Sequence, residues 1–162
     1  MIASATLTAD TEPRQLPSGM PWLSLVHDSG LAPRPERGFV VAVWRDGSIV
    51  KQRDPKARVK GTVQIGRLSS VSLQQMEAAI RNSGLWARPS APRYPDAAED
   101  GLLIRQEGAA RCWFDSGPLA TTPGLREVVD VVLALPLERA SNATLSADDW
   151  LPWSHYREPS CE

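Results

Sequence analysis

Reactive and metal-binding side chains are scarce in this chain. Its only cysteines are Cys112 and Cys161, its only histidines are His27 and His155, and neither histidine has a second His or Cys at metal-ligand spacing. Gly-x-Ser-x-Gly, P-loop and Gly-x-Gly-x-x-Gly motifs are also absent, which removes the common short signatures of hydrolases and nucleotide-binding proteins. The sequence therefore predicts no metal, no cofactor and no recognisable catalytic centre.

Long apolar runs and an excess of one charge are missing as well. No apolar run reaches the roughly 18 residues of a membrane-spanning helix, and residues 1–20 lack the basic region and apolar core of a secretory signal. The net charge is −1, so nothing draws the whole chain to nucleic acid. Two cysteines, one of them next to the chain end, define no disulfide framework and favour a reducing compartment. We therefore expect a cytoplasmic protein that does not cross a membrane.

The composition predicts one folded domain. Apolar residues make up 42% of the chain and charged residues 23%, which is typical of globular proteins, and 162 residues suit a single core. Residues 1–20 have no periodicity and are expected to form a flexible arm. Residues 21–137 form the predicted α+β domain, and residues 138–162 a Trp-rich tail that packs back on it.

Apolar and β-branched segments predict a mainly antiparallel sheet of about five strands. Residues 39–44 are apolar on both faces and should form a central strand, joined through a two-residue Asp46-Gly47 turn to residues 48–50. Residues 61–65 add a strand. A second hairpin flanks Glu107-Gly108, with strands at residues 102–105 and 111–114, and residues 22–26 suit an edge strand.

Two amphipathic helices are expected on one face of this sheet. For the first, Ser72 and Gln75 suit a capping box, Val71 and Met76 a hydrophobic staple, and Gly84 a left-handed stop.

For the second helix, Thr122 suits the N-cap, with Pro123 at the first helical position. The apolar positions from Leu125 to Leu135 follow helical spacing, although residues 128–135 are Val-rich enough to suit a buried strand instead.

One enzymatic alternative depends on Cys112. A thiol at this position could serve as a nucleophile if the fold brought His155 or His27 next to it. Because Cys112 lies within a strand-like run, a small buried apolar side chain is the simpler interpretation. The sequence therefore favours a protein that is not an enzyme.

A basic loop gives a second alternative. Five positive charges lie between Lys51 and Lys60, among them Arg53, Lys56 and Arg58, and such a loop suits phosphates or an acidic protein surface. No aromatic residue interrupts it, so it lacks the stacking platform that single-stranded nucleic acids favour. Nucleic acid is therefore the less favoured partner.

The C-terminal tail carries the third candidate site. Trp150, Trp153 and Tyr156 lie in an acidic, Pro-containing segment, and tryptophan is enriched both in cores and at binding hot spots. The tail either folds back over the sheet or docks on another protein, and solubility favours the first of these. The predicted partner-binding residues are thus the three tail aromatics together with Arg53, Lys56 and Arg58.

Residues 38–85 read as strand, Arg45-Asp46-Gly47 turn, strand, and then Gly66-Arg67-Leu68-Ser69 leading into a capped helix. This layout resembles small bacterial domains such as emfourin, a proteinaceous metalloprotease inhibitor. The resemblance covers under a third of the chain and transfers no binding residue. It implies a compact, non-catalytic bacterial domain that binds another protein, as an inhibitor, immunity or accessory protein does.

Overall fold

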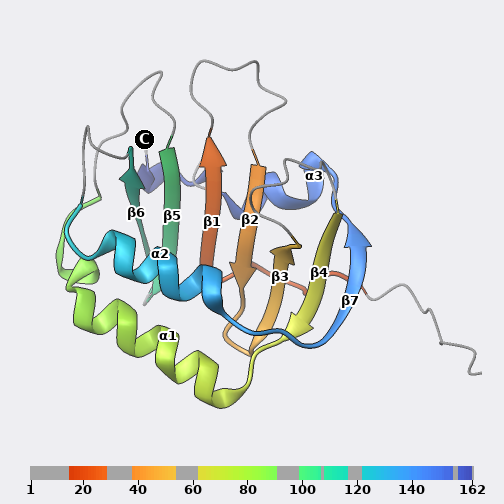
Figure 1. Ribbon diagram of the computed structural model, residues 1–162. Coiled ribbons are helices and arrows are strands. Elements are labelled where there is room, and N and C mark those ends of the chain that lie inside the picture. The colour runs from red at the N-terminus through yellow and green to blue at the C-terminus, as the bar shows by residue number, and fades with distance from the viewer. Residues whose placement is uncertain are drawn as a thin grey trace, which may run out of the picture.

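The computed structural model contains one antiparallel sheet with the strand order β6-β5-β1-β2-β3-β4-β7 (Figure 1). It describes residues 15–28, 38–53, 62–90, 99–106, 108–116, 122–154 and 157–161. The strands are β1 (Leu23–Asp28), β2 (Gly38–Val43), β3 (Ser48–Gln52), β4 (Thr62–Arg67), β5 (Glu99–Gln106), β6 (Ala109–Asp115) and β7 (Glu138–Thr144). The helices are α1 (Ser70–Ser83), α2 (Leu125–Ala134) and α3 (Ala147–Trp150), with the 3₁₀ turns η2 (Leu85–Ala87), η4 (Leu151–Trp153) and η6 (Pro159–Cys161).

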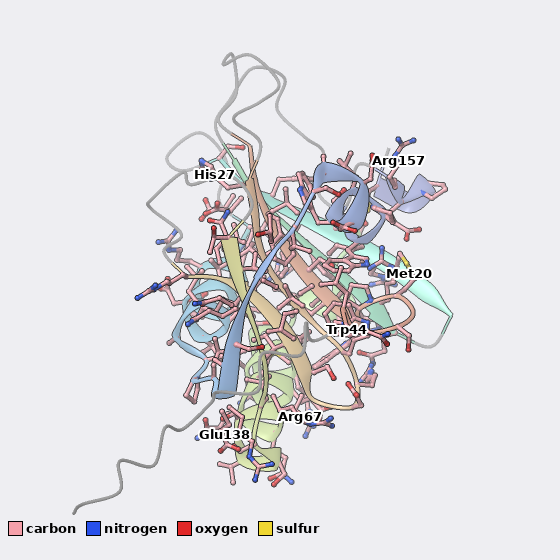
Figure 2. The ribbon with its side chains drawn as sticks, turned by 90° about the vertical axis from the view of Figure 1, so that its right-hand side faces the viewer. Met20, His27, Trp44, Arg67, Glu138 and Arg157 are labelled. Carbon is pink, nitrogen blue, oxygen red and sulfur yellow. A yellow bond between two sulfur atoms is a disulfide. The ribbon has the colours of Figure 1, made fainter. Side chains whose placement is uncertain are left out.

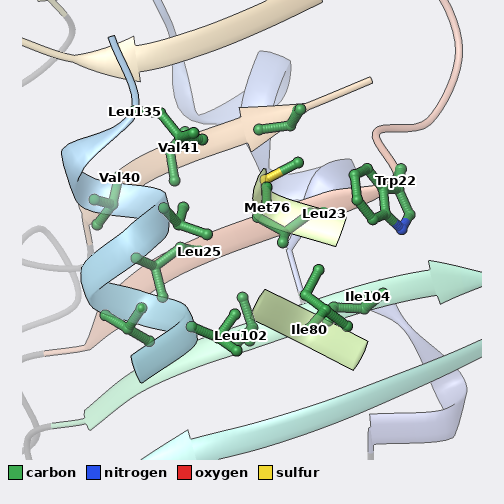
Figure 3. Close-up of a cluster of buried hydrophobic side chains, with 14 of the residues drawn as sticks. Trp22, Leu23, Leu25, Val40, Val41, Met76, Ile80, Leu102, Ile104 and Leu135 are labelled. Atoms are coloured by element: carbon green, nitrogen blue, oxygen red, sulfur yellow. The ribbon is translucent and has the colours of Figure 1, made fainter. Parts of the chain in front are cut away.

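The main core lies between the sheet and the helices α1 and α2, which both cover the same face (Figure 1). Met76 and Ile80 from α1 and the Leu125 to Val132 side of α2 meet strand residues that are almost completely buried (Figure 3). Trp113 of β6 is the largest fully buried side chain in this layer. The prediction of an α+β fold is confirmed; α1 and α2 lie on one face as expected, and the short helix α3 was not predicted.

A second, thinner layer covers the opposite face. Leu145, Trp153 and the half-buried Trp150 pack on a strip of β2, β3 and β4 side chains that includes Phe39 and Trp44. We call residues 145–154 and 157–161 the C-terminal strap. The strap passes behind the sheet from the β7 edge to the β6 edge, where the chain ends (Figure 1).

The sheet is larger than the sequence predicts. It has seven strands rather than about five. β1 pairs with both β2 and β5, so the expectation of an edge strand at residues 22–26 is wrong. β7 lies within the predicted tail and pairs with β4. Its residues are mostly exposed and polar, so no alternation of apolar residues marked it as a strand.

The first hairpin is confirmed, but its turn differs from the predicted one. Trp44 pairs with Ser48, which leaves a three-residue loop with Gly47 in the left-handed region at φ 86°. Asp46 accepts hydrogen bonds from the Ser48 amide and hydroxyl at 2.9 and 2.8 Å. These bonds lower the pKa of Asp46 and stabilise the turn, whose first residue is Arg45.

Both predicted helix starts are corrected. The N-cap of α1 is Ser69, three residues before the predicted cap Ser72, and its side chain accepts from the Ser72 amide at 3.1 Å. Val71 is 59% exposed, so the predicted hydrophobic staple with Met76 does not form. Gly84 ends the helix at φ 68°, as predicted.

α2 starts after Gly124, which has φ 82°, and not after Thr122. The helical alternative for residues 125–135 is the correct one, and the strand alternative is wrong.

Gly124 gives a test of how closely the two helices approach. A Cβ there would lie 2.5 Å from the Ser83 carbonyl oxygen, whereas a Cβ at Gly84 meets nothing within 4 Å. In G84A we expect the free energy of unfolding to fall by about 1–2 kcal/mol, because alanine is strained in the left-handed conformation. In G124A we expect the same loss and about 1–3 kcal/mol more, because the added methyl group overpacks the contact with Ser83. Urea unfolding of both variants measures the difference, and equal losses would contradict the close approach.

Candidate binding pocket

A pocket of about 550 Å³ opens where the end of α1 and η2 meet the sheet. Its size falls in the range of ligand-binding pockets in proteins. The Arg45 turn lies on one side, the α1 residues Glu77, Ile80 and Arg81 line the pocket, and Gln106 reaches it from the end of β5. The lining residues are Trp22, Arg45, Glu77, Ile80, Arg81, Gly84, Trp86, Ala87 and Gln106.

Trp22 and Arg45 form the first wall. Trp22 is 4% exposed, and the Arg45 guanidinium lies 4.2 Å from the centroid of its ring. This is the geometry of a cation–π contact. Arg45 Nη1 also lies 3.4 Å from Glu77 Oε1, and both of these side chains remain substantially exposed. The Trp22 ring nitrogen is buried and has no hydrogen-bond partner among the described residues.

Trp86 also lines the pocket and is held by Arg111. The Arg111 guanidinium lies 5.0 Å from the Trp86 ring centroid and donates to the backbone oxygens of Trp86 and, at 3.0 Å, Arg88. Behind it, Trp86 meets the buried Trp113 edge to face, with ring centroids 6.4 Å apart. These contacts fix η2 and the indole ring on rigid elements.

The pocket is aromatic and carries a slight positive excess. Arg45 and Arg81 line it together with one carboxylate, that of Glu77. Arg81 also lies in the last turn of α1, where a cation favours the negative end of the helix. The arrangement can hold a group that combines an apolar body with a negative charge.

Cys112 is not a free thiol in this structure. It is fully buried on β6, and its sulfur is bonded to that of Cys161, with the two Cα atoms 5.6 Å apart. The expectation that the two cysteines stay unpaired is therefore wrong. Strand alternation turns Cys112 toward the face that η6 crosses, and sequence separation alone did not reveal this meeting.

Neither histidine is seen next to the Cys112–Cys161 disulfide. His27 lies near the far end of β1 from Trp22, and its Nδ1 is 2.8 Å from Asp100 Oδ1 across the strand pair (Figure 2). His155 lies outside the described residues. The hypothesis that Cys112 is a catalytic nucleophile therefore lacks support: its sulfur is bonded to Cys161, and no imidazole lies next to it within the described residues.

Lys51, the first residue of the predicted basic loop, turns inward and binds the end of α2. The Lys51 ammonium donates to the carbonyl oxygens of Leu133 and, at 3.3 Å, Leu135 at the end of α2. Burial lowers the pKa of Lys51. Arg53 is exposed at the end of β3, and Lys56, Arg58 and Lys60 lie outside the described residues.

The tail aromatics are drawn into the second layer. Trp153 is 6% exposed and packs edge-on against Trp44 at 5.0 Å between ring centroids. Trp150 is half-buried and lies 6.4 Å from Phe39 by the same measure. Tyr156 lies outside the described residues.

Two further searches concern the described residues only. They contain no group of three or more His, Cys, Asp or Glu side chains that could hold a metal ion. Of the helices placed in this structure, none is long and apolar enough to cross a membrane.

Comparison with known protein families, with curated proteins and with solved structures finds no significant match. The pocket is therefore interpreted from its own geometry.

The sequence did not single out the pocket. Trp22, Arg45 and Trp86 are spread over 65 positions and belong to a strand start, a turn and a 3₁₀ turn. The signals available were the high tryptophan count and the Arg45-Asp46-Gly47 turn, but neither indicates which tryptophan an arginine will cover.

Lys51 gives a test of the inward-turned basic residue. K51M removes the cation from the end of α2, and we expect a loss of about 1–2 kcal/mol in the free energy of unfolding. R53M removes an exposed charge two positions later and should change stability by less than about 0.5 kcal/mol. Chemical denaturation of both variants makes the comparison, and equal effects would contradict a capping role for Lys51.

Proposed function

We propose that this chain is a non-catalytic binding domain whose partner is another protein. The observation that carries the proposal is the pocket lined by Trp22 and Trp86, with the Arg45 guanidinium over the first ring and the Arg111 guanidinium over the second. Tryptophan and arginine are the residue types that dominate binding energy at protein interfaces. Inhibitor, immunity and accessory proteins act by such binding, as the emfourin-like layout of residues 38–85 also implies.

The charge of the pocket specifies the chemistry of the partner segment. Arg45 spends one N–H group on Glu77, and a guanidinium carries five such donors. An acidic side chain of the partner can therefore bind beside Glu77, while an aromatic or aliphatic side chain fills the space between the indoles. We propose an acidic segment with one large apolar residue as the partner's contribution.

Indole resonances test this proposal directly. The probe is the peptide acetyl-Glu-Phe-Glu-amide, and its neutral counterpart acetyl-Gln-Phe-Gln-amide serves as the matched probe. We expect the acidic peptide alone to shift the Trp22 and Trp86 indole N–H signals, assigned with W22F and W86F, with a dissociation constant of about 1 mM.

A pair of charge-reversal variants locates the site. R45E should weaken the acidic peptide about tenfold or more, because it places a second carboxylate beside Glu77. R126E makes the same charge change at an exposed position on α2 outside the pocket and should leave the affinity unchanged. Equal binding of the two peptides, or shifts confined to other tryptophans, would exclude the proposed recognition.

A photo-crosslinker at position 106 then distinguishes a protein partner from a small molecule. In the native host, a protein crosslink that is lost in R45E and retained in R126E supports a protein partner. If no protein is crosslinked and the pocket still binds a small aromatic acid in vitro, the ligand is a small molecule instead.

A further inference from the structure

The C-terminal strap is attached at two places of different chemistry. The first is aromatic, where Trp153 lies against Trp44 and Phe39 with ring centroids 5.0 and 5.8 Å apart. The second is covalent, where Cys161 is bonded to Cys112 on β6. Between them the strap crosses from one side of the sheet to the other (Figure 1).

The first attachment stands without the second. Ser146 caps α3 through a reciprocal pair of hydrogen bonds with Asp149, and these bonds lower the pKa of that carboxyl. Trp153 is buried in its own cluster together with Leu145. Nothing in this half of the strap depends on a sulfur atom.

The last turn depends on the disulfide far more strongly. The contacts that join residues 157–161 to the sheet include the ion pair from Arg105 Nε to Glu158 Oε2 at 3.4 Å and the packing of Cys161 on Leu103 and Phe114, beside the covalent bond. A three-residue 3₁₀ turn contains few internal hydrogen bonds, so it opens readily where no tether holds it. Arg157 itself is exposed on the strap side of the sheet (Figure 2).

We infer that the Cys112–Cys161 bond is a redox-controlled latch, which holds residues 157–161 over a small apolar patch and releases them when it is reduced. The patch is the side of β5 and β6 formed by Leu103, Cys112 and Phe114. In the closed form its occupant is the end of this same chain. The aromatic half of the strap stays in place in both forms.

The reduction is a thiol–disulfide exchange with a dithiol. Both cysteines are buried, and Cys161, at 9% exposed against 0% for Cys112, is the one that we expect the dithiol to attack. A thiolate of the dithiol bonds to Cys161 and the Cys112 sulfur leaves and takes a proton; the second thiolate then displaces Cys161, which also becomes a thiol. The dithiol is oxidised to its disulfide, and the two electrons reside on Cys112 and Cys161. A cytoplasmic location, which stays a prediction, would favour the released form.

Hydrogen exchange of the intact protein tests the latch without any ligand, so its outcome is independent of the pocket. The Cys161 amide donates to Glu158 and the Arg157 amide to Ser154 in the closed form. On reduction with a dithiol we expect both amides to exchange at least about tenfold faster, while those of α3 and the sheet stay unchanged. Reoxidation should restore slow exchange.

The variant C161S should show the fast exchange without reductant and no further change with it, which separates the latch from other effects of the dithiol. Trypsin should cut after Arg157 faster in the reduced protein than in the oxidised one. Unchanged exchange at residues 157–161 would overturn the inference. It would also be overturned by a rise in exchange throughout the sheet, which would make the bond a staple of the whole domain, or by two titratable thiols in protein denatured without reductant.

Discussion

Burial of β2 from both sides is the constraint on which the rest of the structure depends. Its residues from Phe39 to Val43 are all buried, with Val41 and Val43 facing the helices and Phe39 and Ala42 facing the strap. Each apolar side chain left in water would cost about 1.5–3 kcal/mol, so neither face can remain open. The chain must therefore supply two covering layers, and it does so with very different material.

The helix layer is thick and rigid, and it creates the pocket. Trp113 and Ile80 fill the space beneath η2, so Trp86 rests on fully packed side chains. The turn that carries Arg45 is held by the Asp46 hydrogen bonds, and its Gly47 leaves little room for a side chain, because a Cβ there would lie 3.2 Å from Leu73 Cδ1. Preorganised aromatic walls lose little entropy when a partner binds, which suits a recognition site.

Local chemistry predicted the elements of the fold better than their relations. The Val-rich run before Pro136 and the glycine at 84 were correctly interpreted, because stripe and stop depend on neighbouring residues alone. β7 could not be predicted, because its residues are mostly polar and exposed and show no apolar alternation. It forms a strand through its pairing with β4, which the local sequence does not reveal. The pocket and the disulfide could not be predicted for the same reason. Trp22 contacts Arg45, and Cys112 bonds to Cys161, only because of the strand order, which local sequence does not reveal.

The proposed binding pocket and the proposed latch lie on opposite faces of one small sheet. A residue such as Gln106 faces the pocket, while its neighbour Arg105 faces the strap and pairs with Glu158. Burial lowers the pKa of Arg105, and its Nη2 has no hydrogen-bond partner among the described residues, so the closed strap holds this cation in an incompletely satisfied state. Release of residues 157–161 would return that guanidinium to water while the packed helix face stays as it is. Because adjacent residues of one strand point to opposite faces, the strap end can move without disturbing the pocket walls.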